Sequence, residues 1–168
     1  MSDRARAALG SVVFLVVVPG FVAGLVPWWL TRWRSAGNVP EPLSVAGVLL
    51  VAAGGLVLLH AFARFVVEGL GTPAPIAPTR QLVVGGLYRY VRNPMYLAVA
   101  ATILGQAMML GRPVLLPYVL LFAVVVVAFV RLYEEPTLGR QFGAEYDAYR
   151  RAVPGWWPRG QPWSQTGR

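Results

Sequence analysis

The sequence contains no cysteine, no lysine and a single histidine, His60. Without cysteine the chain has no disulfide, no thiolate nucleophile and no cysteine-based zinc site. One histidine also excludes most histidine-rich metal sites, so we expect no bound metal. Without cysteine, the sequence gives no indication of the redox compartment.

Charged residues are scarce as well. They make up 13% of the 168 residues, whereas about 25% is usual for soluble domains. Hydrophobic residues make up 57%, and the mean hydropathy is +0.56. The length is that of one domain, which we expect to cover residues 1–168. Because the hydrophobic residues are concentrated in long blocks, the composition indicates a membrane protein.

Four apolar segments approach the roughly 20 residues that a transmembrane helix needs. They cover residues 7–30, 43–67, 94–110 and 114–132. The first exceeds the apolar region of a typical signal peptide, so we expect it to be retained. The short sequence Gly111-Arg112-Pro113 separates the last two and predicts a tight helical hairpin. The predicted fold is all-α, a polytopic membrane bundle of about four transmembrane helices.

The arginine distribution predicts the orientation of this bundle. All fifteen basic residues are arginine, and the net charge is +8. Four spans put the N-terminus, the loop of residues 68–93 and the tail on one side, which holds most of the arginines. That side is cytoplasmic by the positive-inside rule. The arginines flank apolar spans and form no single dense patch, which favours membrane lipids over nucleic acid as partners. We expect a multi-pass inner (plasma) membrane protein with both termini in the cytoplasm.

The tail from Glu134 has the pattern of an amphipathic helix. Leu138, Phe142, Tyr146 and Tyr149 recur at helical spacing on one face, with charged residues on the other. Such a helix suits the membrane interface on the cytoplasmic side.

Two polar segments, residues 86–96 and 134–158, carry the groups that can bind a ligand or take part in a reaction. Pro94 suits the first turn of the third helix, where its missing N–H costs nothing. The N–H groups of that turn, beside Arg92 and Asn93, form a site for a carboxylate. The paired carboxylates Glu134 and Glu135 close the fourth span on the same side, and they suit an ammonium group or the hydroxyls of a ribose.

These segments resemble the isoprenylcysteine carboxyl methyltransferases and the wider group that includes the phospholipid N-methyltransferases. The resemblance rests on Gly86-x-Tyr88-x-x-x-Arg92-Asn93-Pro94-x-Tyr96, a following hairpin, and Glu134-Glu135-x-x-Leu138-x-x-x-Phe142-Gly143-x-x-Tyr146-x-x-Tyr149-x-x-x-Val153-Pro154. It covers roughly residues 86–158. Eukaryotic members usually have histidine in place of Asn93 and a larger helical bundle. These two departures count against a prenylated-protein substrate.

The resemblance implies methyl transfer from S-adenosylmethionine to a lipid-soluble or amphiphilic acceptor, a carboxylate or an amine. The implied cofactor-binding residues are Tyr88, Arg92, Asn93, Pro94, Tyr96, Glu134 and Glu135, with Gly105 and Gln106 lying deeper. A carboxylate acceptor needs only a cation such as Arg89 or Arg92 to orient it. An amine or hydroxyl acceptor loses a proton, for which Glu134 or Glu135 is the candidate base.

Two other functions remain open at this stage. Sterol reductases look similar in the C-terminal cofactor region but use NADPH, and a non-catalytic membrane scaffold would keep the helices without the chemistry. The role of His60 is also open, although a neutral histidine bonded to a backbone carbonyl is the commoner case. The segment Thr72-Pro73-Ala74-Pro75 is either a rigid turn or a lid.

Overall fold

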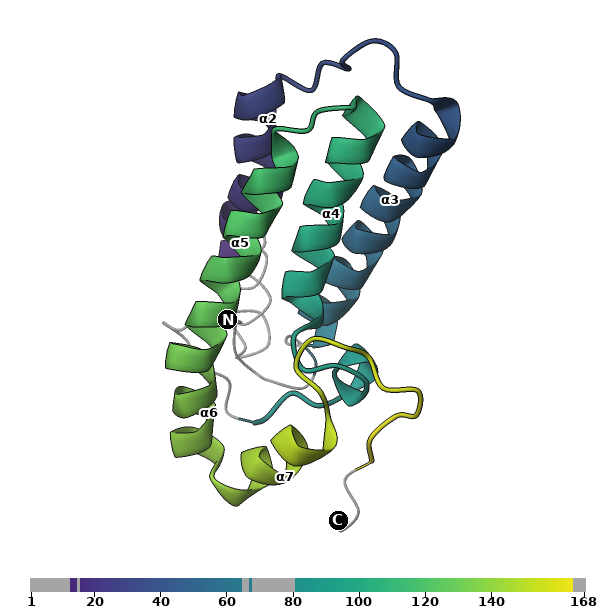
Figure 1. Cartoon of the computed structure of the whole chain (residues 1–168). Coiled ribbons are helices and arrows are strands. Elements are labelled where there is room, and N and C mark those ends of the chain that lie inside the picture. Colours follow the sequence, from purple (N-terminus) through teal and green to yellow (C-terminus); the bar gives the residue numbers. More distant parts are fainter. Residues whose placement is uncertain (1–12, 15, 65–66, 68–80, 165–168) are drawn as a thin grey trace.

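A computed structural model describes residues 13–14, 16–64, 67 and 81–164 of the chain. Within these ranges the structure is all-α and contains no strand, as the sequence predicts. The long apolar helices run side by side along one axis (Figure 1). The elements in chain order are η1 (Phe21–Leu25), α2 (Val26–Thr31), α3 (Glu41–Arg64), η3 (Gly86–Arg89), α4 (Pro94–Leu110), α5 (Leu115–Phe129), η4 (Val130–Glu134), α6 (Glu135–Phe142) and α7 (Ala144–Ala152).

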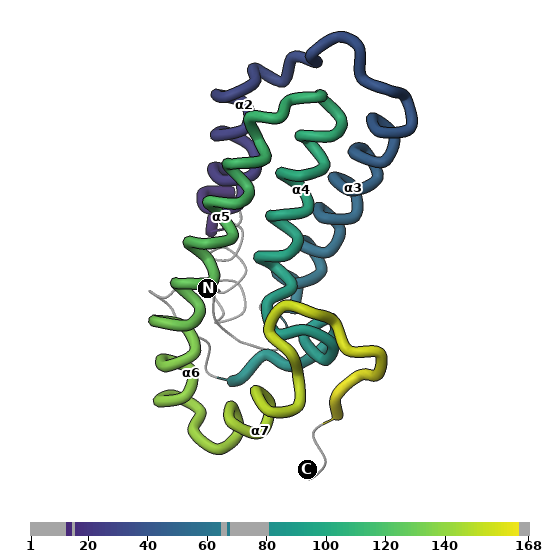
Figure 2. Tube along the Cα trace, in the orientation of Figure 1, coloured from purple at the N-terminus to yellow at the C-terminus, as the bar shows by residue number. Residues whose placement is uncertain are grey.

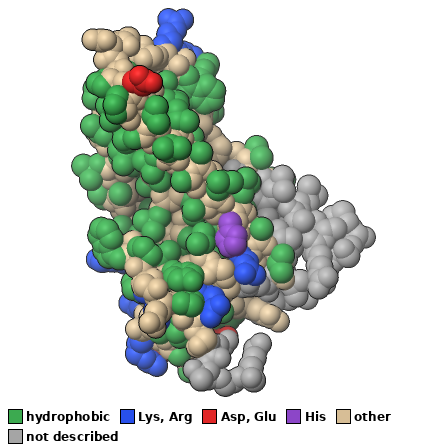
Figure 3. Space-filling model, turned by 90° about the vertical axis from the view of Figure 1, so that its right-hand side faces the viewer, with side chains coloured by type: hydrophobic (Ala, Val, Ile, Leu, Met, Phe, Trp, Pro, Cys, Tyr) green, Lys and Arg blue, Asp and Glu red, His purple; other side chains and the backbone are tan. Residues whose placement is uncertain are grey.

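Two helical runs are long and apolar enough to cross a membrane, Glu41–Arg64 and Leu115–Phe142. Only 11% and 17% of their apolar windows are buried, whereas the core helix of a soluble protein would be mostly buried. Val16–Thr31 and Pro94–Leu110 are shorter apolar helices beside them. Hydrophobic side chains cover most of the bundle's length in Figure 3. The protein is therefore a membrane protein built from apolar helices.

Helices α3 and α4 are packed closely through small residues. Gly47, Gly54 and Ala61 recur every seven residues on α3 and are buried. A Cβ atom on Gly47 would lie 2.5 Å from the backbone nitrogen of Met109 and 2.6 Å from the carbonyl oxygen of Gly105. In lipid, where apolar side chains gain nothing by leaving the solvent, such close backbone contact is a main source of helix association.

The third predicted segment has the bounds that the sequence indicates. Helix α4 begins at Pro94 and ends at Leu110, and Gly111 follows in the left-handed conformation with φ 61°. The amide of Gly111 donates to the carbonyls of Ala107 and Met108, which satisfies the last turn. Helix α5 starts four residues later at Leu115, so the tight hairpin is confirmed.

The other bounds differ in part from the predicted ones. The second helix begins at Glu41, two residues before the predicted start. Residues 7–12 of the first predicted span and residues 72–75 lie outside the described residues.

The fourth helix ends later than the sequence predicts. The apolar run stops at Leu132, but the helical run continues through η4 and α6 to Phe142, so Glu134 and Glu135 lie inside a helix and not at its end. Gly143, with φ 51°, then separates α6 from α7.

The amphipathic tail is confirmed, as two helices. The residues predicted on its apolar face lie in one hydrophobic cluster, whose buried members are Tyr146, Tyr149 and Val153. Leu138 and Phe142 from α6 and Leu82 and Val84 from the preceding loop pack against these residues. The apolar face of the tail is thus turned toward the protein itself. Figure 2 shows the chain after α7 returning across the segment that precedes α4.

Candidate functional site

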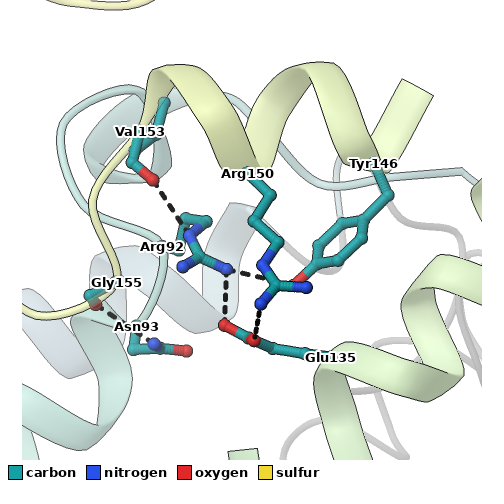
Figure 4. A network of polar contacts seen from close by, with 7 residues as sticks. All are labelled: Arg92, Asn93, Glu135, Tyr146, Arg150, Val153 and Gly155. Carbon is teal, nitrogen blue, oxygen red and sulfur yellow. Dashed lines mark hydrogen bonds and ion pairs between the residues drawn. The ribbon is translucent and has the colours of Figure 1, made fainter. Parts of the chain in front are cut away.

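Arg92 is the centre of a polar network at the end of the bundle that carries α7 (Figure 4). Its Nη1 donates to Glu135 Oε1 at 2.7 Å and to the Tyr146 hydroxyl at 3.1 Å, while its Nε donates to the Val153 carbonyl at 2.9 Å. The side chains of Arg92 and Glu135 are 14% and 12% exposed. An ion pair this sheltered is screened far less than a surface pair.

A second arginine shares the same carboxylate. Arg150 on α7 places its Nη2 3.0 Å from Glu135 Oε2, but its side chain is 53% exposed. Both oxygens of Glu135 are therefore paired with guanidinium groups. Each oxygen still has a second lone pair, so Glu135 can also accept an N–H or O–H from a ligand.

Glu134 has a different environment. Its Oε2 accepts a hydrogen bond from the Tyr96 hydroxyl at 2.9 Å, whereas the two arginine ion pairs described above are made by Glu135. The two neighbouring carboxylates thus differ: Glu135 faces cations, and Glu134 faces a neutral donor.

The N-terminus of α4 completes this corner of the molecule. Asn93 precedes Pro94 and directs its Nδ2 to the carbonyl of Gly155 at 3.1 Å rather than to the helix backbone. Gly155 lies so close that an added Cβ would be 3.3 Å from Arg92 Nη2. The first turn of α4 therefore keeps backbone N–H groups for an anionic ligand.

The chain after α7 holds the segment before α4 in place. The amides of Arg92, Arg159 and Trp163 bond across the two segments, to the carbonyls of Pro154, Tyr90 and Arg89 respectively, at 2.9–3.0 Å. Arg89 Nε donates back to the Trp163 carbonyl at 2.7 Å. We refer to residues 153–163 as the C-terminal strap.

A buried tyrosine adds to this attachment. The Tyr149 hydroxyl donates to the Tyr88 carbonyl at 2.6 Å, and the Tyr149 ring lies 5.3 Å from that of Trp163. Burial raises the pKa of Tyr149 well above its ordinary value, so the hydroxyl keeps its proton and remains a donor.

Replacing the anchoring tryptophan tests the strap. Trp163→Ala removes the ring contact with Tyr149, so we expect faster amide hydrogen exchange at residues 89–92. Trp157→Ala is the matched control, because Trp157 is 80% exposed and its loss should leave the exchange rate unchanged. Equal exchange in both variants would contradict a holding role for the strap.

The structure brings together most of the residues that the sequence singles out. Arg92, Asn93, Tyr96, Glu134 and Glu135 meet in one region. Tyr88 and Arg89 lie in η3 just before it, where the Tyr88 side chain is buried against Ala61 and Val83.

Two predicted cofactor residues lie elsewhere. Gln106 is ten residues beyond Tyr96 along α4, about 15 Å at 1.5 Å per residue. Its amide bonds to the Ala23 and Thr102 carbonyls and accepts from the Trp33 indole. Gly105 packs on the α3 backbone at Gly47 and Val51.

Some members of the network are absent from the sequence prediction. The carbonyls of Val153 and Gly155 contribute through the backbone, which no residue type reveals. Tyr146 belongs to the quoted motif, but its helical spacing favours only an apolar face; the hydroxyl at its tip is the available signal for a polar role.

Comparison with known proteins identifies the family. A sequence profile of the phospholipid methyltransferase family matches residues 43–145, more than half of the chain. The chain belongs to this family. No curated protein and no solved structure gave a match.

Membership in the phospholipid methyltransferase family, which shares a clan with the isoprenylcysteine carboxyl methyltransferases, confirms the predicted resemblance. The protein is an integral membrane methyltransferase that depends on S-adenosylmethionine. The matched range contains α4, Arg92, both glutamates and α3 apart from its first two residues, whereas Tyr146 and the C-terminal strap follow it. The family assignment also favours methyl transfer over the reductase and scaffold alternatives.

The residues present suit the methyl donor of this family. S-adenosylmethionine carries a carboxylate, an ammonium, a sulfonium and two ribose hydroxyls. The network supplies Arg92 and helix N–H groups for an anion and the two glutamates for cations and hydroxyls. The described residues therefore offer partners of the right charge for the carboxylate, the ammonium and the ribose hydroxyls of the donor.

Proposed function

We propose that this protein methylates an amine in a phospholipid headgroup at the end of the bundle that carries α7. The observation that carries the proposal is the network of Arg92, Glu135, Glu134 and Tyr96 at the end of an apolar bundle. A phospholipid places its headgroup at that level of the membrane while its acyl chains lie along the helices. Of the groups in such headgroups, an amine is the ordinary nucleophile.

In this proposal the methyl donor is held by Tyr88, Arg92, Asn93, Pro94, Tyr96 and Glu135, whereas Glu134 serves the acceptor. Arg92 and the first-turn N–H groups of α4 bind its carboxylate, and Glu135 accepts from its ammonium or ribose. Bound there, S-adenosylmethionine supplies a methyl group activated by its sulfonium. The protein's share is to hold donor and acceptor in line and to exclude water. The contacts of Gly105 and Gln106 favour a packing role instead.

Glu134 and Glu135 have different roles in this proposal. Both oxygens of Glu135 are already paired with guanidinium groups, so we assign Glu135 to binding and not to proton transfer. Glu134 accepts a hydrogen bond from the neutral Tyr96 hydroxyl, so we assign Glu134 to take the proton of the attacking amine. Arg89 is held by Trp163 and is placed to orient a headgroup phosphate.

Substitution of each glutamate tests this division. Glu134→Gln should keep the affinity for S-adenosylhomocysteine but lower the rate of transfer from labelled S-adenosylmethionine to phosphatidylethanolamine vesicles by 10²-fold or more. Glu135→Gln, one residue away, should instead weaken binding.

The same assay tests the reaction itself. Binding is measured by calorimetry on detergent-purified protein with NADPH as a negative control. Saturable binding of the two sulfur ligands with no labelled lipid product would contradict the phospholipid acceptor, and binding of NADPH alone would contradict methyl transfer.

We further propose that this end faces the cytoplasm of the inner membrane, where S-adenosylmethionine is available. Arg92, Arg131, Arg150 and Arg159 belong to this end, whereas Arg34 and Arg112 lie together at the opposite end. A reporter fused to the C-terminus should signal a cytoplasmic location. A periplasmic signal would reverse both the topology and the route of the donor.

A further inference from the structure

The π-turns η1 and η4 share a local sequence pattern. Each ends two residues before a proline: η1 ends at Leu25 before Pro27, and η4 ends at Glu134 before Pro136. In each, the residue before the proline closes the turn with an i→i−5 bond, Val26 to the Phe21 carbonyl and Glu135 to the Val130 carbonyl. The prolines explain the wide turns, because a proline inside a helix donates no hydrogen bond and crowds the carbonyl four residues earlier.

At Pro27 the surroundings compensate for the missing donor. The carbonyls four and five residues before it, on Ala23 and Val22, have no N–H to accept from at that position. Gln106 Nε2 donates to the Ala23 carbonyl and the Tyr118 hydroxyl donates to the Val22 carbonyl, both at 2.7 Å. Here the wide turn joins the first helix to α4 and α5, so its role is structural.

At Pro136 the wide turn changes which residues face the protein. Val126 and Val130 are buried on the inner side of α5 and η4. In an uninterrupted α-helix the residue seven positions after Val126 lies on nearly the same face, and that residue is Tyr133. Tyr133 is instead 47% exposed and stacks on Phe129, with ring centroids 5.2 Å apart. Glu134, eight positions after Val126, takes the inner place and contacts Tyr96.

The register after the turn is therefore displaced by one residue. One residue of an α-helix corresponds to about 100° of rotation about the helix axis. Without the π-turn η4, Tyr133 would face Tyr96. The carboxylate of Glu134 would rotate away from the Tyr96 hydroxyl, and that of Glu135 would rotate away from the Arg92 guanidinium. A one-residue π-turn is a known way of turning side chains into a functional site.

We propose that Pro136 is a positioning residue of the methyltransferase site: it maintains the π-turn η4 and thereby directs Glu134 to Tyr96 and Glu135 to Arg92. The effect on ligand binding rests on the function proposed above, whereas the effect on helix register does not. Pro136 touches neither the donor nor the acceptor in this scheme; it acts through the two glutamates.

The test compares Pro136→Ala with Pro27→Ala in the full chain. Alanine restores the N–H, so the helix in Pro136→Ala can close its α-helical bonds and lose the extra residue of the turn. We expect its affinity for S-adenosylhomocysteine to fall tenfold or more, with a melting temperature that is unchanged or higher. Pro27→Ala, which makes the same change in the same local pattern far from the site, should keep the affinity of the unmodified protein.

A second readout follows the register without any ligand. Because the chain has no cysteine, Tyr133→Cys introduces the only thiol, and a maleimide should label it at this exposed position. Adding Pro136→Ala should turn that position inward and slow labelling at least fivefold, whereas adding Pro27→Ala should not.

The two readouts separate the inference from the proposed function. Unchanged labelling with Pro136→Ala would overturn the register role. Slowed labelling together with unchanged S-adenosylhomocysteine affinity would overturn the positioning role. If the unmodified protein binds no S-adenosylhomocysteine, the proposed function fails and the labelling result alone decides the register role.

Discussion

Arg92→Ala is expected to lower the affinity for S-adenosylhomocysteine by about 100-fold while the bundle stays folded. The substitution removes three side-chain hydrogen bonds, to Glu135, Tyr146 and Val153. In the proposed site Arg92 binds the donor carboxylate. Removing one partner of a sheltered charge pair in a binding site costs about 3 kcal/mol, and each 1.4 kcal/mol is a factor of ten in affinity. The bundle persists because the packing of α3 on α4 does not involve Arg92. Calorimetry and a thermal melt in detergent measure the two effects separately.

Arg150→Ala is the matched control for this experiment. Arg150 pairs with the same carboxylate, but its half-exposed side chain is screened by water, so its loss should change affinity less than threefold. Equal losses in the two variants would mean that charge alone matters and that the placement of Arg92 does not. Unchanged affinity in both would remove the proposed donor site.

Gly47→Ala is expected to lower the melting temperature of the purified protein by about 5–10 °C. The added Cβ would lie 2.5 Å from the Met109 nitrogen, and all three nearest atoms are backbone atoms that cannot move aside singly. The helices have to separate along a line of small residues, for which overpacking costs of about 1–3 kcal/mol are typical. A thermal melt in detergent gives the shift.

Gly55→Ala provides the comparison within the same helix. A Cβ on Gly55 meets no atom within 4 Å, and alanine is the better helix former by about 1 kcal/mol, so this variant should melt at the same or a higher temperature. If Gly47→Ala melted like Gly55→Ala, close packing at Gly47 would not be a determinant of stability.

Local signals explain which parts of the fold are predictable from the sequence. Pro94 and Gly111 mark both ends of α4, because each residue has a backbone preference that suits its position. The predicted end of the fourth helix is wrong, and the reason for this is also physical. Hydropathy reports where apolar side chains stop, at Leu132, whereas the helical hydrogen bonds continue through Glu134 and Glu135 until Gly143. A polar sequence can extend a helix beyond the membrane.

The site was predictable only as far as its charged motif extends. The motif brings Arg92 and the glutamates to one side of the membrane, and the structure joins Arg92 to Glu135. Gln106 instead donates to the Ala23 carbonyl, which Pro27 leaves without a backbone donor, and the strap acts largely through its backbone. Neither interaction depends on a residue type that marks it along the chain.

The C-terminal strap also has a consequence for biosynthesis. The Arg92 side chain donates to the carbonyl of Val153, 61 positions later in the chain, and the Asn93 side chain donates to the carbonyl of Gly155. At about 5–20 residues per second, a ribosome reaches Val153 about 3–12 s after it has passed Arg92. During that interval the transmembrane helices can enter the lipid while the network of Arg92 is still incomplete. The order of synthesis therefore lets membrane insertion precede assembly of the network, because a nascent chain lacks this site until Val153 and Gly155 have been made.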